Sequence, residues 1–367
     1  MPLSLVYMER ITNQICWVNT MTKSIVVAIN KRCEGHGSFS LALQPSFTIE
    51  HEGKTHTVLI HYNPEEGSSV TGDVCTNYDV IIDNHYTIFK DSGIIKNCIR
   101  PIDPRVKDKV SPLVRYGKSG NMFHAHDAGI KHGIEVLCPY AILREGDEIE
   151  KHPQFNRHPE FDKVIFKPEN AANGDRQIVI PYDKYFIFAK QVLNGLKLQQ
   201  VTDNNCSGYA TLFVTSNTRN EDMYDKVINP LGVVVLPFVE DVVEEYRVLR
   251  GGDFIRVAER KLTEDQGFIR VDSSADAIVE GNELNDYEAG RASLERFISL
   301  DKVKAFLDDI DFYYGSVDIY IRKRGDEYVV GIFEYSTQHG VVYVSSEDHI
   351  QMAQEYIKSV LLRKGLI

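Results

Sequence analysis

Short apolar runs rich in β-branched residues recur along the first part of the chain, separated by Gly, Asn, Asp and Pro. The runs at 24–29, 57–62 and 78–84 have the length and composition that are typical of strands. Segment 99–112 contains three prolines, and this composition predicts a linker. We therefore expect an N-terminal α/β domain over residues 1–110.

After this linker, helical and strand-like patterns alternate. The pattern at 121–131 predicts a helix that stops near Gly133 and is followed by a strand. Residues 161–180 indicate a strand, a loop of small residues and a second strand, and 231–239 is an apolar strand interrupted by a proline. These elements predict a central subdomain over residues 111–235.

The remaining pattern predicts a third unit over residues 236–367. Residues 244–262 indicate a hairpin with Gly-Gly at its turn, and 290–310 have helical periodicity. A second hairpin is expected over 316–338. The segment that begins at Ser345 is typical of a helix with an N-capping start and basic residues near its end.

The second hairpin carries the most informative pattern. Arg-Gly-Asp-Glu at 324–327 predicts its turn, and a turn centred at Asp326 puts Asp318 opposite Glu334. Because side chains alternate between the two faces of a strand, the odd positions are expected in the core: Val317, Ile319, Ile321, Val329, Gly331 and Phe333. The even positions at the open end carry polar side chains: Ser316, Asp318, Glu334, Ser336 and Gln338.

Asp318 and Glu334 would then face each other with their Cβ atoms roughly 5 Å apart. Two carboxylates at that distance repel by on the order of 1 kcal/mol in water and by more near protein. Either one of them takes up a proton, or a cation lies between them, and Mg²⁺ prefers such oxygen ligands. The alternative is a pair of solvated acids on a surface hairpin with Lys and Arg nearby. The hairpin alone leaves both interpretations open.

Composition narrows the class of protein. With 43% hydrophobic and 26% charged residues, the chain of 367 residues predicts a folded globular protein. The net charge of −12 argues against duplex nucleic acid as a partner and leaves room for a local basic pocket that binds a small phosphorylated ligand. Six scattered cysteines without a CxxC pair favour reduced thiols and a cytoplasmic location. No signal peptide and no membrane span are expected, because no apolar run is long enough.

Taken in order, several segments resemble the ATP-grasp superfamily of carboxylate–amine ligases over roughly residues 110–340. VIFKPENAANGDRQIV (164–179) is similar to the family's strand with a phosphate-contacting lysine and the flexible loop after it. VVVLPFVEDVVEEYRVLRGGDFIRVAERK (233–261) is similar to its adenine hinge and the acidic-x-Arg segment that follows. VDIYI (317–321) and GIFEYS (331–336) resemble its metal-binding hairpin.

The resemblance implies roles in nucleotide binding for the matching residues. Lys167 would contact phosphate, and Arg247 and Arg260 would be catalytic residues that face the phosphates. The backbone of the hinge would border adenine, at Leu236, Pro237, Phe238 and Val239. Either Glu240 or Glu244 would reach the ribose.

The resemblance also implies a metal site, with two departures from the family pattern. Asp318 and Glu334 would ligate Mg²⁺ together with Ser336, which stands where the family commonly has Asn; Gln338 is the alternative donor of that oxygen. Segment 120–143 resembles the helix and strand that open the grasp region. The lysine expected there falls at Met122, so that Lys118 would have to replace it.

For the whole chain, the resemblance implies an ATP-grasp-like fold of mixed α/β (α+β) structure. An N-terminal α/β domain would be followed by two grasp subdomains that enclose a nucleotide cleft. The implied activity is that of an ATP-dependent carboxylate–amine ligase of peptide type, which forms an acyl phosphate with ATP and Mg²⁺ beneath a lid at 169–177. Its partners would be a small-molecule or peptide carboxylate and an amine acceptor, and the sequence is compatible with a homo-oligomer.

Other classes of protein stay open. Met122 and Ser336 favour a nucleotide-binding or assembly protein on the same fold that lacks ligase activity. A structural or interaction protein with a coincidental hairpin would not bind nucleotide. A kinase-type enzyme would use the same metal and transfer phosphate to a hydroxyl group.

Overall fold

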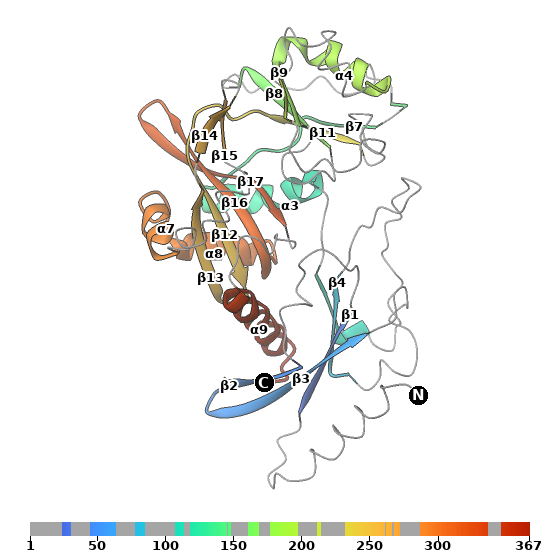
Figure 1. Cartoon of the computed structure of the whole chain (residues 1–367), viewed down its shortest axis with the longest axis vertical. Helices are drawn as coiled ribbons and strands as arrows, with labels where there is room; N and C mark the ends of the chain where they lie inside the picture. The colour runs from blue at the N-terminus through green and yellow to red at the C-terminus, as the bar shows by residue number, and fades with distance from the viewer. Residues whose placement is uncertain are drawn as a thin grey trace.

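The computed structural model describes residues 24–30, 45–63, 78–84, 107–113, 118–144, 146–147, 161–168, 177–196, 211–213, 232–260, 262–265, 268–271, 287–336 and 346–367. Within them, three five-stranded sheets follow one another along the long axis of the molecule, with helices packed against them (Figure 1). The expected mixed α/β class is confirmed. None of the helices in these residues is long and apolar enough to span a membrane.

The N-terminal sheet has the strand order β2-β3-β1-β4-β5. Its strands are β1 (Ile25–Asn30), β2 (Ser46–His51), β3 (Lys54–Asn63), β4 (Val80–Asn84) and β5 (Val110–Leu113). All of them pair in parallel except β2, which is antiparallel to β3. The three strands expected in this part of the chain are therefore confirmed.

The end of segment 99–112 is wrongly predicted as linker. The short helix η2 (Lys107–Lys109) and β5 occupy it, and β5 pairs with β4 at the edge of the N-terminal sheet. An edge strand tolerates Pro112 because one side of it forms no ladder hydrogen bonds. The proline count alone could not reveal this.

The second sheet has the order β10-β9-β8-β11-β7. Its strands are β7 (Ala141–Leu143), β8 (Lys163–Pro168), β9 (Gln177–Pro181), β10 (Thr211–Phe213) and β11 (Val233–Pro237). One face packs on η4 (Tyr182–Lys184) and α4 (Tyr185–Leu193), around Phe166 and Phe188. The other face is also apolar, with Ile165, Val234 and Leu236. Burial on both faces explains why these strands are continuous apolar runs.

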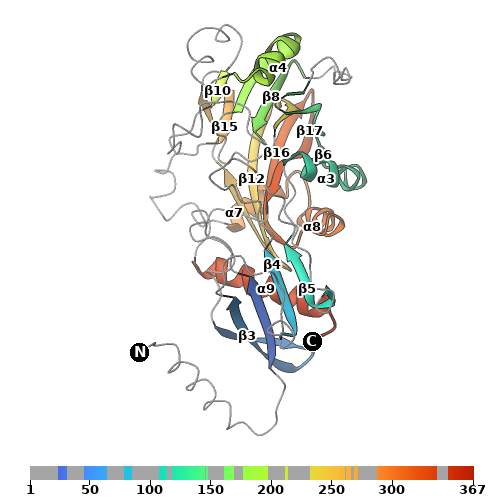
Figure 2. The ribbon, with the colours of Figure 1, turned by 90° about the vertical axis from the view of Figure 1, so that its right-hand side faces the viewer.

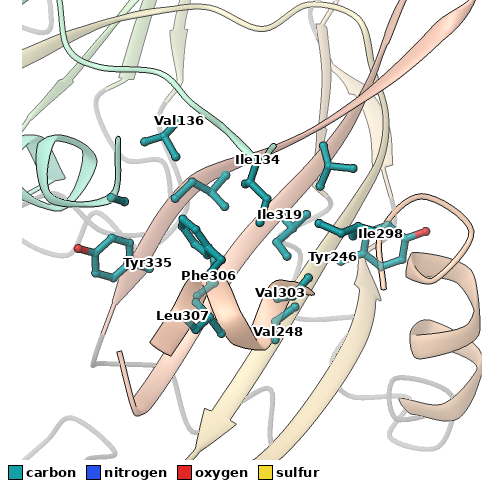
Figure 3. Packing of buried hydrophobic residues seen from close by; sticks show 14 of the residues in the cluster. Ile134, Val136, Tyr246, Val248, Ile298, Val303, Phe306, Leu307, Ile319 and Tyr335 are labelled. Atoms are coloured by element: carbon teal, nitrogen blue, oxygen red, sulfur yellow. The ribbon is translucent and has the colours of Figure 1, made fainter. Parts of the chain in front are cut away.

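The third sheet has the order β13-β12-β16-β17-β6. Its strands are β6 (Glu135–Val136), β12 (Val242–Gly251), β13 (Phe254–Arg260), β16 (Tyr314–Arg324) and β17 (Glu327–Ser336). The helices α3 (Lys118–His132), α7 (Tyr287–Leu294) and α8 (Leu300–Asp309) pack against it, and α3 and α8 lie side by side (Figure 2). Figure 3 shows the core between α8 and the sheet, where Phe306 and Val303 meet Ile319 and Val248. A small ribbon of β14 (Leu262–Asp265) and β15 (Phe268–Val271) follows β13.

The helical periodicity over 290–310 corresponds to two helices, α7 and α8. Ser299 separates them in an extended conformation, and its hydroxyl accepts a hydrogen bond from the backbone N of Lys302 at 3.3 Å. Serine is a favoured N-cap because its oxygen satisfies a free amide at a helix start. The apolar periodicity continues across this break, so that periodicity alone indicates one helix.

Helix α9 (Ser346–Arg363) joins the N-terminal sheet to the third sheet. Its buried residues Met352, Ile357 and Leu361 share one apolar cluster with β1, β3 and β4 and with Leu249 of β12. The backbone of the helix comes so close to β12 that a Cβ atom on Gly251 would lie 2.1 Å from the carbonyl oxygen of Met352. The C-terminal helix thus packs on the N-terminal sheet as well as on the third sheet.

The hairpin β16–β17 keeps the expected pairing at its open end but shifts register in the middle. Asp318 pairs with Glu334 and Ser316 with Ser336, as expected, whereas Ile319 pairs with Ile332. Phe333 is therefore an extra residue that forms a β-bulge. The core face holds Val317, Ile319 and Ile321, as expected, but on β17 it holds Val330, Ile332 and Tyr335. The core positions expected at Val329, Gly331 and Phe333 are wrong, because the turn pairs Arg324 with Glu327, one residue away from the expected register, and a one-residue shift exchanges the faces of a strand. The bulge restores the expected register at Asp318 and Glu334.

The predicted ranges of the subdomains stay predictions. Helix α3 and strand β6 lie within 111–235 in the sequence, yet they pack on the third sheet and not on the second. Of the six cysteines, only Cys138 lies in the described residues, and it is a free thiol.

Candidate active site

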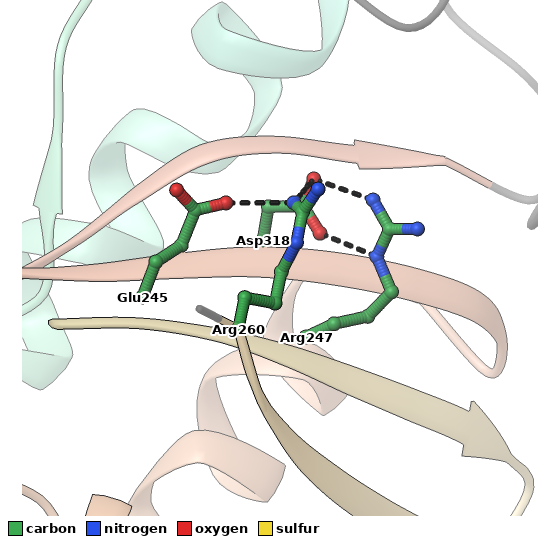
Figure 4. A network of polar contacts seen from close by, with 4 residues as sticks. All are labelled: Glu245, Arg247, Arg260 and Asp318. Carbon is green, nitrogen blue, oxygen red and sulfur yellow. Dashed lines mark hydrogen bonds and ion pairs between the residues drawn. The ribbon is translucent and has the colours of Figure 1, made fainter. Parts of the chain in front are cut away.

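Asp318 lies on β16 directly beside Arg247 of the neighbouring strand β12. Arg247 Nε donates to Asp318 Oδ1 at 2.8 Å, and Nη2 donates to Oδ2 at 2.9 Å (Figure 4). Both carboxylate oxygens are therefore bound by one guanidinium in the bidentate geometry that gives strong, directional pairs. Asp318 is 7% exposed, so water screens this pair only weakly.

Arg260, on β13, completes the cluster. Its Nη1 donates to Glu245 Oε1 at 2.6 Å and to Asp318 Oδ2 at 3.0 Å (Figure 4). Glu245 is directly opposite Arg260 in the β12–β13 ladder, and it was not among the residues predicted from the sequence. The signal that could have found it is its spacing, since Glu245 and Arg247 are two residues apart on one strand and share a face.

Lys167 reaches the same region from the second sheet. Its Nζ lies 5.8 Å from the ring centroid of Phe333 on β17, and its charge lowers the pKa of both Asp318 and Glu245. On β8, Lys167 is two residues from Ile165 and shares a face with it, and Ile165 belongs to the second apolar face of that sheet. The lysine therefore extends from this apolar face toward the carboxylates of the third sheet.

Burial and charge act in opposite directions on the two buried carboxyl groups. Burial raises the pKa of Asp318, but the guanidinium groups of Arg247 and Arg260 outweigh it, and the pKa lies below its usual value. Burial raises the pKa of Glu245 to about 7; Arg260 lowers it and the negative charge of Asp318 raises it further. The cluster thus holds one carboxylate that is firmly ionised and one carboxyl group that exchanges a proton near neutrality.

Glu334 faces Asp318 on the adjacent strand and is half-buried. Ser336 follows it and pairs with Ser316, while Gln338 lies outside the described residues. Within the described residues, no group of three or more His, Cys, Asp or Glu is placed to hold a metal. Mg²⁺ commonly takes one or two carboxylates and completes its shell with water and substrate phosphate. The oxygens of Asp318 and Glu334 are of this chemical type, although arginines bind both oxygens of Asp318.

The residues expected around adenine lie at the end of β11 and in the crossover to β12. Leu236, Pro237 and Val239 are buried, and the backbone N of Phe238 donates to the carbonyl oxygen of Lys163 at 3.0 Å. Glu240 is exposed and forms an ion pair with Lys163 of β8.

Glu244, the alternative to Glu240, lies elsewhere. Glu244 binds Arg296 at 2.7 Å and 2.9 Å, and the hydroxyl of Tyr246 donates to it from the core side of the third sheet. It therefore lies on the other face of the sheet from Arg247, and its contact with the ribose stays a prediction. Met122, on α3, is buried in the core between that helix and the third sheet. The side chain of Lys118 and residues 169–176 of the expected lid lie outside the described part.

No family model and no curated protein matches this sequence. Solved structures do match. A D-alanine–D-alanine ligase from Bacillus anthracis complexed with ATP is 8% identical, with a TM-score of 0.44, over 93% of this chain and 99% of that chain. A RimK domain ATP-grasp protein from Sphaerobacter thermophilus is 10% identical, with a TM-score of 0.37, over 92% and 99%.

An L-amino acid ligase from Bacillus licheniformis is 8% identical, with a TM-score of 0.33, over 88% of this chain and 69% of that chain. Likenesses of this degree transfer no activity, substrate or residue role to this chain.

Proposed function

We propose that the chain is an ATP-dependent carboxylate–amine ligase that works through an acyl phosphate and uses Mg²⁺. The observation that carries the proposal is the convergence of Lys167, Arg247 and Arg260, from two sheets, on a carboxylate that faces Glu334. Phosphoryl transfer needs charge neutralisation and alignment more than a reacting side chain. This cluster supplies both.

The arginines would change partners when a triphosphate enters. In the described structure both oxygens of Asp318 are taken by guanidinium groups. Phosphate oxygens offer Arg247 and Arg260 more negative charge, and a turn of the guanidinium groups toward them would free Asp318. Asp318 and Glu334 would then hold Mg²⁺, which supplies charge neutralisation at the phosphate oxygens when bound. Glu245 would keep Arg260 oriented throughout.

The proposed reaction has two steps. An oxygen of the substrate carboxylate attacks the γ-phosphorus of ATP, a new P–O bond forms, and the bond to the bridging oxygen breaks with release of ADP. The nitrogen of the amine then attacks the acyl carbon, a C–N bond forms, inorganic phosphate leaves, and the nitrogen gives up a proton. Lys167, Arg247 and Arg260 would stabilise the charge on the phosphoryl group in the first step.

The test is to measure ADP release with a panel of amino acids and short peptides as carboxylate donors, with and without amine acceptors. Hydroxylamine added in place of the amine should trap the acyl phosphate as a hydroxamate. Amide product and hydroxamate, both dependent on Mg²⁺, would support the proposal. A phosphate ester as product would instead indicate a kinase-type enzyme.

The second candidate function is nucleotide binding without turnover. It is favoured by Met122, which is buried where the resemblance places a lysine, and by the complete engagement of Asp318 by arginine. This candidate predicts that ATP binds and that no ADP forms with any pair of substrates.

A further inference from the structure

Phe333 has no partner of its own in the β16–β17 ladder. Pairing runs from the turn to Ile319 and Ile332 and resumes at Asp318 and Glu334. If the pairing that starts at the turn continued without an extra residue, Glu334 would pair with Val317. The carboxylate of Glu334 would then point into the core, where Val317 lies. The bulge therefore brings two consecutive side chains, Phe333 and Glu334, to the side of the sheet that carries Asp318.

A row of residues across three strands lies beside this bulge. Tyr320 of β16 pairs with Gly331 of β17, and Gly331 pairs with Glu135 of β6. The tyrosine ring lies across the glycine, since a Cβ atom on Gly331 would come 2.3 Å from Tyr320 Cζ. Its hydroxyl donates to Glu135 Oε2 at 2.5 Å, and Arg322 donates to the same carboxylate at 2.6 Å and 2.9 Å. The ring of Tyr320 is thus fixed by its packing across Gly331 and by the hydrogen bond of its hydroxyl to Glu135.

The ring of Phe333 packs on this fixed tyrosine and faces Lys167. The ring centroids of Tyr320 and Phe333 are 4.5 Å apart, and Lys167 Nζ is 5.8 Å from the centroid of Phe333. Phe333 belongs to an apolar cluster with Phe161, Val239 and Tyr320, which joins the two sheets. A cation within about 6 Å of a ring centroid is attracted to the face of the ring.

We propose that Phe333 is a positioning residue for Lys167. Its ring, placed by the bulge and fixed by Tyr320, holds the lysine ammonium beside the Asp318 cluster before nucleotide binds. This role rests on the proposed function, in which Lys167 contacts phosphate. The bulge then explains how one strand supplies both the support for the lysine and the carboxylate of Glu334 from adjacent residues.

Nucleotide affinity tests the role through two matched variants. Phe333→Leu removes the ring and keeps an apolar side chain, and we expect it to weaken binding of Mg·ATP in calorimetry by about two- to fivefold. Phe333→Tyr keeps the ring and should bind as the wild type does. In a Lys167→Met background Phe333→Leu should have no further effect, because its effect passes through the lysine. An equal loss in both backgrounds would overturn the proposal.

The acylation rate of Lys167 by acetic anhydride, followed by mass spectrometry without nucleotide, tests the positioning independently of function. The rate should rise in Phe333→Leu and in Tyr320→Leu and stay unchanged in Phe333→Tyr. Lys163, on the same strand, is the internal reference, and an unchanged rate there shows that the fold is kept. If ATP does not bind but Lys167 responds in this way, only the proposed function fails. Equal labelling of Lys167 in the wild type and Phe333→Leu overturns the positioning role, whether or not ATP binds.

Discussion

Asp318 is a buried carboxylate whose negative charge is balanced by two arginines from neighbouring strands. Removing one partner of such a pair leaves a charge with little solvent to stabilise it. At the scale of single residues, the stability of the cluster should therefore depend strongly on Arg247. The same residue is proposed to serve the phosphates, so stability and function are coupled at one position.

Arg247→Met should lower the free energy of unfolding by about 3 kcal/mol, because it leaves Asp318 without its bidentate partner. The measurement is urea denaturation at neutral pH. The control is Arg291→Met, which breaks an exposed pair between Arg291 of α7 and Glu295 and should change the free energy by less than about 0.5 kcal/mol. Equal effects of the two substitutions would contradict the assignment of a buried, tightly paired cluster.

Because of Glu245, the free energy of unfolding should fall as pH rises, whereas an acid in an ordinary ion pair makes it rise with pH. Burial raises its pKa from 4.5 to about 7 in the folded protein, so the folded state binds a proton more tightly than the unfolded state. The resulting stabilisation is complete below the unfolded pKa and is lost as pH rises through the folded pKa. Relative to Glu245→Gln, the wild type should lose on the order of 3 kcal/mol between pH 4.5 and 7.5.

Urea midpoints of the wild type and Glu245→Gln, measured across that range, check this expectation. The lowered pKa of Asp318 acts only at more acidic pH, where stability falls as the carboxylate takes up a proton. It therefore does not interfere in the window that reports on Glu245. Parallel stability curves for the two proteins would show that Glu245 is ionised throughout and would refute the argument from burial.

At the scale of elements, the hairpin β16–β17 shows what the sequence can and cannot predict. The period-two pattern correctly placed Val317, Ile319 and Ile321 in the core and Asp318 opposite Glu334, because alternation is a local property of a strand. The bulge at Phe333 was not predictable in this way. The neighbouring Tyr320 hydrogen-bonds to Glu135, which is 185 residues away in the sequence, and a local pattern carries no information about such a contact.

Three other features were also not predicted from the local pattern: the break at Ser299, strand β5 and the role of Glu245. The break at Ser299 lies within one continuous apolar periodicity, and β5 escaped notice because its proline is tolerated at a sheet edge. Glu245 is the acid of the acidic-x-Arg segment, but its role in the cluster depends on its pairing with Arg260 across the β12–β13 ladder. Contacts between distant segments decided β5 and the pairing of Glu245 with Arg260, whereas the break at Ser299 depends on a local capping contact that apolar periodicity does not detect.

Gly331→Ala tests the row of residues beside the bulge. The new methyl group would overlap the ring of Tyr320, so we expect a loss of about 1–3 kcal/mol in the free energy of unfolding. In a Tyr320→Leu background the overlap is relieved, and the same substitution should have a much smaller effect. A double-mutant cycle in urea measures this coupling. Additive effects of the two substitutions would mean that the ring does not lie over Gly331.

At the scale of the whole molecule, α9 links the first sheet of the chain to the last. Its apolar face packs on β1, β3 and β4, and Gly251 of β12 touches its backbone. The two sheets therefore share one apolar cluster with the helix between them. This arrangement predicts that they unfold together.

Ile357→Ala should lower the free energy of unfolding by about 2–5 kcal/mol, since Ile357 is fully buried in that shared cluster. Gln351→Ala, at an exposed position of the same helix, is the control and should have little effect. Hydrogen exchange should show faster exchange in both β1 and β12 of the Ile357 variant. Faster exchange confined to the N-terminal sheet would contradict a cooperative link through α9.

The most direct test of the central claim is thermal unfolding of the wild type and Glu334→Gln with ATP, in the presence and absence of Mg²⁺. Glu327→Gln, an exposed carboxylate at the turn end of the same hairpin, is the matched control. Ligand at about 100 times its dissociation constant stabilises a folded protein by about 2.7 kcal/mol. We expect a clear rise in melting temperature with Mg·ATP for the wild type and Glu327→Gln, and its near loss in Glu334→Gln. The same rise in Glu334→Gln as in the wild type, or no rise in any of the three proteins, would contradict a metal–nucleotide site at the facing carboxylates.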